Sequence, residues 1–276
     1  MDKKILLVND IPGYGKVATQ AMLPILSHMG YRVFNLPTAL ISNTLDYGKF
    51  EILDTTTYMK HTIELWKELG FTFDCVCTGF LVSDEQGKLL AEFLSKEKGL
   101  KVVDPIMGDN GSLYNGVSEK RIDTMKRLCK HSDILIPNGT EASFLSNLYV
   151  GDTYHTEEQC YKIIEELLLL GAKSIVITST KDGTGNHFIR GYDGINKEYF
   201  HVPFKHIPVR FPGTGDMFSA VMVGEVLKGR SLKDSVKIAA RTLGQWIEEN
   251  KDNKDKFQGI PVEQSLHILD AEEKNL

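Results

Sequence analysis

Hydrophobic residues follow two alternating patterns along this chain. In the first, three to five apolar residues stand together, which is typical of a buried strand; in the second, they recur every three or four positions, as on one face of a helix. The predicted strands are Lys4–Val8, Tyr31–Leu36, Asp74–Thr78, Leu100–Val103, Ile134–Ile136 and Ser174–Thr178. Strands that alternate with helices indicate the α/β class, with a mostly parallel sheet and helices on both faces.

The predicted helices are marked by their ends and by their apolar faces. The helix within Val17–Gly30 contains Pro24, which is expected to bend it. Capping boxes at Ser83–Gln86 and Thr156–Gln159 each open a helix, because the first and fourth residues satisfy each other's backbone N–H groups. The long helix near the C-terminus has an apolar face made of Leu232, Val236, Ala239, Leu243 and Trp246.

Two segments depart from the alternation of strands and helices. Pro37–Phe50 has weak periodicity and is predicted to form a small flap over the site, while Gly183–Val202 alternates like a hairpin or meander appended to the sheet. No linker, internal repeat or low-complexity tract is visible in the sequence. We therefore expect residues 1–276 to form a single domain.

Charge and hydropathy argue against several functional classes. The 32 Lys and Arg residues are outnumbered by 37 Asp and Glu residues, a net charge of −5 that argues against nucleic-acid binding. The longest apolar run lies within Ile163–Leu170, whereas a bilayer-spanning helix needs ~20 such residues. Met1–Lys4 is followed by too few apolar residues for a signal peptide. We expect a soluble, cytoplasmic protein with no nucleic-acid or membrane partner.

The cysteines indicate a reduced protein. Cys75 and Cys77 stand two apart on a predicted strand and are expected to face the same side, while Cys129 and Cys160 are isolated. None of the four has C-x-x-C spacing, so neither a zinc knuckle nor a disulfide framework is indicated.

The residues after each strand are the functional candidates, because ligands of parallel sheets bind beyond the carboxyl ends of the strands. After the first strand, Gly13–Ala18 matches G-x-G-x-x-A. The second strand ends at Asn35 and Leu36 without the carboxylate that a dinucleotide site requires, and Val17 stands where a P-loop has Ser or Thr. A glycine-rich turn is the favoured interpretation of this segment.

Two later strand ends carry polar groups. Asp104 and Asp109 could hold a metal ion, or face phosphate groups through one, although Asp and Gly are also ordinary turn residues. Asn138 and Glu141 follow the next strand. Taken alone, this second pair is better explained as a helix N-cap with its capping partner.

The strongest local signal is Gly213–Asp216, which opens a helix that is apolar on nearly every side. Glycines at a helix N-terminus let backbone N–H groups approach an anion, and the helix dipole adds positive potential. Such a terminus can stabilise a phosphoryl group during transfer, and Asp216 can accept a proton from an attacking hydroxyl. The alternative, a carboxylate that only favours the dipole, leaves the glycines before a buried helix unexplained.

Together these residues resemble known motifs. Gly213–Asp216 is similar to the signature of the ribokinase-like superfamily, which phosphorylates hydroxymethyl groups with MgATP. Asp104–Asp109 and Pro137–Ala142 resemble the D-P-V-x-G-D and P-N-x-x-E-A motifs of its vitamin-kinase branch. Thr78–Phe80 looks like that branch's T/S-G-Y turn, and Ser42–Gly48 matches parts of its S-N-H-T-x-Y-G flap. The chain most resembles the pyridoxal (pyridoxamine) kinase family, which implies a three-layer ribokinase-like fold.

The resemblance implies a role for each matching residue. Asp216 matches the catalytic base that deprotonates the 5′-hydroxymethyl group, and the turn before it matches the anion hole, namely Gly213, Thr214 and Gly215. Asp109 and Glu141 match positions near magnesium. The implied ATP-binding residues are Asp104, Asn138, Glu141, Thr178, Ser179, Gly213, Thr214 and Gly215.

The implied substrate-binding residues include departures from the family. They are Asp10, Asn43, Leu45, Phe80 and Asp216. Asp10 falls where pyridoxal kinases usually carry Ser and hydroxymethylpyrimidine kinases carry Asp. Leu45 replaces a flap Thr, Thr44 a flap His, and Phe80 a Tyr. These changes lie in the substrate pocket and not among the phosphoryl-transfer groups. The resemblance therefore predicts the class of reaction more directly than it predicts which vitamer is the substrate.

The resemblance predicts ATP-dependent phosphorylation of the 5′-hydroxymethyl group of pyridoxal, pyridoxamine and pyridoxine, with Mg²⁺. An alternative, prompted by Asp10, is a hydroxymethylpyrimidine or phosphomethylpyrimidine kinase of thiamine synthesis. A sugar kinase matches the N-terminal motifs less well, and a non-catalytic binding relative leaves the intact Asp216 and acidic motifs unexplained. Relatives are usually homodimers, which implies the same here. The preferred vitamer and any requirement for a monovalent cation stay open.

Overall fold

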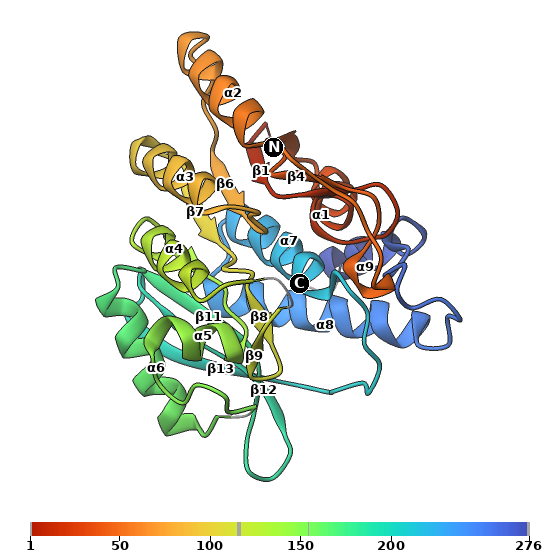
Figure 1. The fold of residues 1–276 in the computed structure, drawn as a ribbon. Helices are drawn as coiled ribbons and strands as arrows, with labels where there is room; N and C mark the ends of the chain where they lie inside the picture. The colour runs from red at the N-terminus through yellow and green to blue at the C-terminus, as the bar shows by residue number, and fades with distance from the viewer. Residues whose placement is uncertain (1, 115–116, 154, 275–276) are drawn as a thin grey trace. The chain divides into compact units, whose positions relative to one another are not determined.

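The computed structural model describes residues 2–114, 117–153 and 155–274 and divides into two compact units (Figure 1). Unit 1 comprises Met1–Thr55 and Phe204–Leu276, so it contains both ends of the chain. Unit 2 comprises Thr56–Pro203.

Unit 1 joins the N-terminal strands and first helix of the chain to its C-terminal helices. β1 and β3 pair in parallel, with Lys4 opposite Arg32, and a separate small sheet has the strand order β2-β4-β5. α7 packs against both α1 and α8. The elements are β1 (Lys4–Val8), β2 (Ile11–Pro12), α1 (Ala18–His28), β3 (Arg32–Asn35), β4 (Ala39–Ile41), η1 (Leu45–Tyr47), β5 (Ile52–Asp54), α7 (Thr214–Leu227), α8 (Leu232–Asn250), η2 (Val262–Gln264) and α9 (His267–Lys274).

The core of unit 1 explains the composition of α7. Every residue from Met217 to Val223 is buried, because α1 and α8 pack against this helix. A helix enclosed in this way is apolar on all sides. The charged residues of α7, Asp216 and Glu225, are therefore confined to its two ends.

Unit 2 is built around a mostly parallel sheet with the order β13-β12-β11-β10-β7-β6. β6, β7, β10 and β11 are parallel, whereas β12 runs antiparallel to β11. Figure 1 shows α3, α4 and α6 along one side of these strands. The elements are α2 (Thr56–Glu68), β6 (Cys75–Thr78), α3 (Asp84–Lys96), β7 (Leu100–Val103), β8 (Gly108–Asp109), β9 (Ser112–Leu113), α4 (Lys120–Cys129), β10 (Ile134–Leu135), α5 (Gly139–Ser146), α6 (Glu157–Leu169), β11 (Ser174–Lys181), β12 (His187–Asp193) and β13 (Glu198–Phe204).

The structure confirms the α/β class and the mostly parallel sheet. The six predicted strands occur as β1, β3, β6, β7, β10 and β11, and the predicted appended hairpin contains β12 and β13. Gly30 and Gly171 follow α1 and α6 with left-handed φ angles of 86° and 108°, as expected of helix-ending glycines. The Thr156–Gln159 capping box is complete.

Other details differ from the prediction. The box at Ser83–Gln86 is only half formed, because Gln86 Oε1 accepts the N–H of Val82 (3.0 Å) and not that of Ser83. The predicted elements do not include α2 or α4. The flap is more regular than expected, because β4 pairs with β5 on one side and with the two-residue strand β2 on the other.

The cysteines agree with the expected reduced state. All four are buried and free, and Cys75 Sγ lies 3.7 Å from Cys77 Sγ, on the same side of β6. Within the described part of the chain, no helix is both long enough and apolar enough to cross a bilayer.

Candidate active site

The start of α7 is held against the segment that leads into α1. Gly213, the N-cap of α7, has a left-handed φ of 83°, and a Cβ at this position would lie 2.1 Å from the carbonyl oxygen of Lys16. Any other residue would clash with that backbone. The glycine therefore lets the first turn of α7 approach the backbone of Lys16 and Val17.

This close approach determines the position of the Asp216 carboxylate. Its Oδ2 accepts the backbone N–H of Ala18 at 2.8 Å, and its Oδ1 accepts the side-chain amide of Asn9 at 3.3 Å. Ala18 has φ 49°, an unusual conformation for a residue with a side chain. Asp216 is thus oriented by the end of β1 and the beginning of α1.

The face of the turn beyond Gly215 is open. Gly215 is exposed, and a Cβ there would meet nothing within 4 Å. The first N–H groups of a helix have no partner within it and carry positive partial charge. Gly213, Thr214 and Gly215 therefore form a terminus that an anion can approach, beside a carboxylate that can accept a proton.

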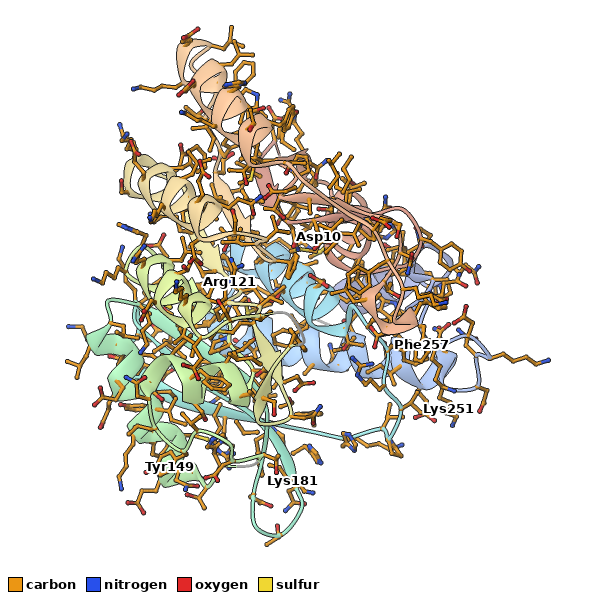
Figure 2. All side chains as sticks on the ribbon, viewed as in Figure 1. Asp10, Arg121, Tyr149, Lys181, Lys251 and Phe257 are labelled. Atoms are coloured by element: carbon orange, nitrogen blue, oxygen red, sulfur yellow. The ribbon has the colours of Figure 1, made fainter. Side chains whose placement is uncertain are left out.

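A second carboxylate lies close to Asp216. Asp10, labelled in Figure 2, is 5% exposed, and its backbone N–H donates to Asn9 Oδ1 at 3.0 Å. Burial, and then the charge of Asp216, raise the pKa of Asp10 to about 7. Burial raises the pKa of Asp216 to about 6, although the hydrogen bonds from Ala18 and Asn9 oppose the shift. Asp216 is therefore the more acidic carboxyl of the two.

Asn9 is a site residue that the motif analysis does not identify. Its side-chain amide donates to Asp216, and its side-chain oxygen accepts from the backbone of Asp10. The only signal in the sequence is its place directly after the first strand, next to Asp10.

The flap residues Asn43 and Leu45 occupy different environments. The Asn43 amide donates to the carbonyl oxygens of Lys49 (2.8 Å) and Thr44 (3.1 Å), so it holds the flap turn together. Leu45 is 41% exposed. Thr44 Oγ1 donates to the carbonyl oxygen of Phe257 (2.7 Å), which Figure 2 labels on the segment after α8. The flap is therefore anchored to the C-terminal part of unit 1.

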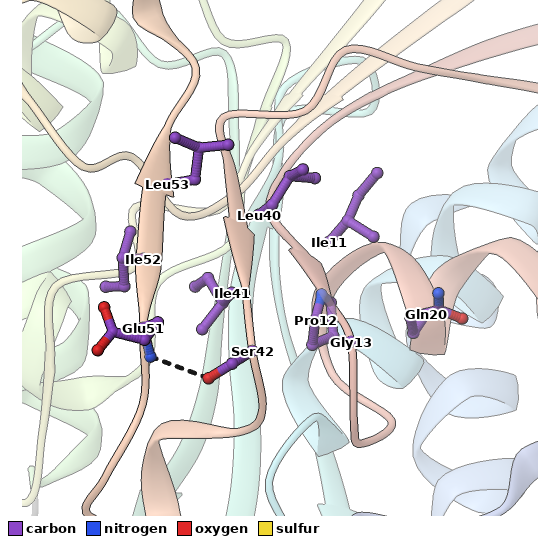
Figure 3. Close-up of a pocket in the computed structure, with 10 residues that line it drawn as sticks. All are labelled: Ile11, Pro12, Gly13, Gln20, Leu40, Ile41, Ser42, Glu51, Ile52 and Leu53. Atoms are coloured by element: carbon purple, nitrogen blue, oxygen red, sulfur yellow. Dashed lines mark hydrogen bonds between the residues drawn. The ribbon is translucent and has the colours of Figure 1, made fainter.

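A surface hollow of about 580 Å³ lies on the small sheet (Figure 3). Ile11, Leu40, Ile52 and Leu53 contribute apolar side chains to it, and the N–H of Glu51 donates to Ser42 Oγ at 2.9 Å across the β4–β5 pair. None of the predicted substrate residues lines this hollow.

In unit 2, Asn138 and Glu141 form the capping box that opens α5. Asn138 Oδ1 accepts the N–H of Glu141, and Glu141 Oε2 accepts the N–H of Asn138, both at 2.9 Å. Glu141 Oε1 also accepts the N–H of Met107 at 3.0 Å. Burial, and to a smaller extent Asp109, raise the pKa of Glu141 to about 8, although these backbone donors oppose the shift. The interpretation of Asn138 and Glu141 as a helix cap is therefore correct. The bond from Met107 to Glu141 also brings the Asp104–Asp109 segment next to this cap.

The other nucleotide-side candidates lie at neighbouring strand ends. The N–H of Asp104 donates to the carbonyl oxygen of Thr78 at 3.1 Å, and Thr178 forms an isolated parallel bridge with Asn138. Ser179 is exposed at the irregularity in β11, with φ 54°. Phe80, two residues beyond β6, is partly exposed. The structure therefore brings Asp109, Glu141, Asn138 and Thr178 into one region of unit 2.

The carboxylates of unit 2 fit magnesium that is bound mainly by phosphate and water. Asp109 is exposed and close enough to Glu141 to affect its pKa, so two hard oxygen donors face one region. Among the described residues, no group of three or more His, Cys, Asp or Glu side chains could hold a metal ion. Mg²⁺ commonly takes one or two carboxylates and completes its octahedron with substrate phosphates and waters.

Comparisons with known proteins support the expected resemblance. The family model for phosphomethylpyrimidine kinase matches residues 19–260. A Bacteroides thetaiotaomicron protein, provisionally named a phosphomethylpyrimidine kinase and crystallised with pyridoxal, is 33% identical, with 98% of this chain and 96% of that chain covered and a TM-score of 0.92. Lactobacillus plantarum pyridoxal kinase is 26% identical to this chain, with a TM-score of 0.89. The match covers 99% of this chain and 98% of that one. Arabidopsis thaliana pyridoxal kinase is 25% identical over 279 residues, which cover 96% of this chain and 88% of that protein.

The raised pKa of Asp10 predicts a pH-dependent stability. An unfolded Asp ionises near pH 3.8, whereas folded Asp10 does so near pH 7, so stability falls as the pH rises through this interval. Asp10→Asn removes the penalty and should raise the free energy of unfolding by roughly 1–3 kcal/mol at pH 8, with little effect near pH 4. Urea unfolding at both pH values measures the difference, and Asp252→Asn, an exposed site, is the control. Equal gains at both pH values would contradict the assigned burial cost.

Proposed function

This chain belongs to the phosphomethylpyrimidine kinase family of the ribokinase-like superfamily, and we propose that it uses ATP to phosphorylate the 5′-hydroxymethyl group of vitamin B6 vitamers. The observation that carries the proposal is the Asp216 carboxylate, held by Asn9 and Ala18 beside the open N-terminus of α7. Pyridoxal in the crystal structure of a 33% identical protein, and the names of the pyridoxal kinase relatives, support a vitamer as substrate.

In the proposed reaction, Asp216 acts as the general base. A primary alcohol is a weak nucleophile at neutral pH, so a carboxylate within reach helps by accepting its proton as the oxygen–phosphorus bond forms. The bond from the γ-phosphorus to the bridging oxygen breaks in the same transfer, and ADP leaves. With a pKa of about 6, Asp216 is ionised near pH 7.5 and still basic enough to take the proton.

The turn of Gly213, Thr214 and Gly215 serves as the anion hole. Its backbone N–H groups are fixed by the helix before the substrate arrives, so they stabilise charge on the transferred group without reorganisation. The missing side chain at Gly215 leaves room for a phosphate oxygen.

We assign the nucleotide to unit 2. Asp104, Asn138, Glu141, Thr178 and Ser179 are the proposed contacts of ATP. Asp109 and Glu141 would hold Mg²⁺, which supplies positive charge that offsets the charge of the phosphates. In this assignment the two units act as one kinase domain, and a requirement for a monovalent cation stays open.

Substrate choice is assigned to Asp10, Asn43, Leu45 and Phe80. Asp10 favours one second candidate, a hydroxymethylpyrimidine kinase, because it is buried and has a pKa of about 7, so it can present a carboxyl O–H or a carboxylate to a ring. The name of the matching family model points the same way.

We further propose that the protein works in the cytoplasm as a homodimer. Leu40, Ile52 and Leu53 of the small sheet are 44%, 39% and 61% exposed, and β5 lies at the edge of that sheet. Neighbouring exposed apolar residues of this kind are typical of a surface that another protein covers. No nucleic-acid or membrane partner is proposed.

A substrate panel tests the proposed function. With saturating MgATP, ADP release should be fastest with one of pyridoxal, pyridoxamine or pyridoxine, and at least tenfold slower with hydroxymethylpyrimidine. A tenfold preference in this range corresponds to ~1.4 kcal/mol, which a few pocket contacts can provide. A reversed order would select the pyrimidine kinase.

Asp216→Asn tests the base directly. The amide keeps the shape of the carboxylate and can accept from Ala18, but it does not take a proton usefully. General-base removal commonly costs ~10²–10⁴-fold, so single-turnover phosphorylation should slow by about that factor. Binding of ATP and vitamer should persist, because neither depends on the proton transfer. A rate within about threefold of the original would remove Asp216 as the base.

Glu141→Gln separates metal binding from helix capping. Gln159 completes the other capping box by accepting the N–H of Thr156 at 2.8 Å, which shows that Gln can serve at this position in the cap. The variant should therefore fold, but it replaces a carboxyl group that can ionise on binding Mg²⁺ by an amide that stays neutral. We expect a higher magnesium concentration at half-maximal rate and slower turnover. An unchanged magnesium titration would leave Glu141 as a helix cap only.

A further inference from the structure

Strand β12 of unit 2, labelled in Figure 1, carries a buried arginine. Arg190 is 3% exposed, and its Nη1 donates to Thr180 Oγ1 at 2.7 Å. Its guanidinium carbon lies 4.6 Å from the centre of the Phe188 ring. Among the described residues, no Asp or Glu forms an ion pair with Arg190, and its buried Nε has no hydrogen-bond partner. Burying a cation without an opposite charge costs free energy, so the position of Arg190 calls for an explanation.

The neighbouring thiol of Cys160 does not neutralise this cation. Cys160 lies on α6 and is buried, and burial raises the pKa of its thiol to about 11, although the charge of Arg190 opposes the shift. The thiol is therefore uncharged near pH 7. The strongest polar contact of Arg190 is its bond to the hydroxyl of Thr180.

Thr180 stands at the irregularity in β11. Ile177 pairs with Arg190 and Thr180 pairs with Phe188, so three steps along β11 lie opposite two steps along β12. The extra residue makes a β-bulge, a feature that turns side chains of a strand in a new direction. Ser179, inside the bulge, has a φ of 54°, which is an uncommon conformation for a residue with a side chain. Contacts on either side must therefore hold the bulge in place.

The hydroxyl of Thr180 supplies such a contact. It donates to the carbonyl oxygen of Phe188 at 2.9 Å and accepts from Arg190 at 2.7 Å, so it joins the end of the bulge to two residues of β12. Because a hydroxyl has a single hydrogen, these two bonds together fix its orientation. The two residues before it face outward, since Thr178 is partly exposed and Ser179 is exposed.

We propose that Arg190 is a positioning residue, which acts through Thr180 to hold the bulge that presents Thr178 and Ser179 to the nucleotide. This inference rests on the proposed function, which assigns both of those residues to ATP. Thr178 forms a bridge with Asn138, another assigned contact of ATP, so a change in the bulge would move two contacts relative to a third. Arg190 is buried and is not itself assigned a contact with ATP.

Thr180→Val tests the connection between Arg190 and the bulge. Valine has nearly the same shape but lacks the hydroxyl, whereas Thr180→Ser keeps the hydroxyl and is the conservative variant. Thr242→Val is the matched control, because Thr242 is also buried and its Oγ1 has no hydrogen-bond partner in the described part of the chain. The affinity of the full chain for MgATP is measured by isothermal titration calorimetry. Steady-state kinetics with the most active vitamer then give kcat and the KM for each substrate.

The expected result is a loss confined to the nucleotide. Thr180→Val should raise the Kd for MgATP and the KM for ATP by about 5–20-fold, because misplaced binding groups lose much of their contribution. The KM for the vitamer should stay within about twofold and kcat within about threefold of the original, since neither depends on the bulge. Thr180→Ser should restore the affinity for MgATP, and Thr242→Val should bind MgATP as the original does.

Three results would overturn the positioning role. They are an unchanged affinity of Thr180→Val for MgATP, a joint deterioration of kcat and both KM values, and a Thr180→Ser variant as weak as Thr180→Val. If Thr180→Val does not fold, Arg190→Lys replaces it, because lysine keeps the charge but lacks the planar guanidinium; the same criteria apply to it. An original chain that does not bind MgATP would refute the proposed function itself. An original chain that binds MgATP and is indifferent to these changes would refute only the role of Arg190.

Discussion

The approach of two backbones at Gly213 is the constraint on which the site in unit 1 depends. Only a residue without Cβ can sit this close to the carbonyl of Lys16, and the left-handed φ at the same position favours glycine independently. Once α7 begins there, Asp216 in its first turn reaches the N–H of Ala18 and the amide of Asn9. The packing of these two backbone segments therefore fixes the orientation of the Asp216 carboxylate.

This arrangement costs stability and separates the pKa values of two neighbouring carboxyl groups. Asp10 and Asp216 are brought together where burial disfavours their charged forms, and the pKa of each rises. Hydrogen bonds from Asn9 and Ala18 favour ionised Asp216, whereas Asp10 also experiences the charge of its neighbour. The two carboxyls thus titrate at different pH values, and a neutral solution holds one mainly charged and the other near its midpoint. Such a separation is what acid–base chemistry requires of paired carboxyls.

The two ends of α7 differ in the groups that surround them. Its N-terminus offers unpaired N–H groups beside Asp216, where the helix dipole is positive. Its C-terminus, where the dipole is negative, is surrounded by Lys228 and Arg230, which the dipole and the buried Glu225 both favour. In unit 2, the backbone N–H groups of Asn138 and Met107 likewise fix the carboxylate of Glu141, which caps α5.

Periodicity and motif order in the sequence were sufficient for the α/β class, the main strands and the start of a buried helix at Gly213–Asp216, because these are local properties of the chain. The predicted elements did not include α2 and α4, although α4 has apolar residues at helical spacing, and they did not include the strand pairing of Ile11–Pro12. Tertiary structure decided that Asn9 and Ala18 would bind Asp216, since those residues lie about 200 positions away along the chain. It also decided the raised pKa values of Asp10 and Asp216, because burial results from packing between distant segments of the chain.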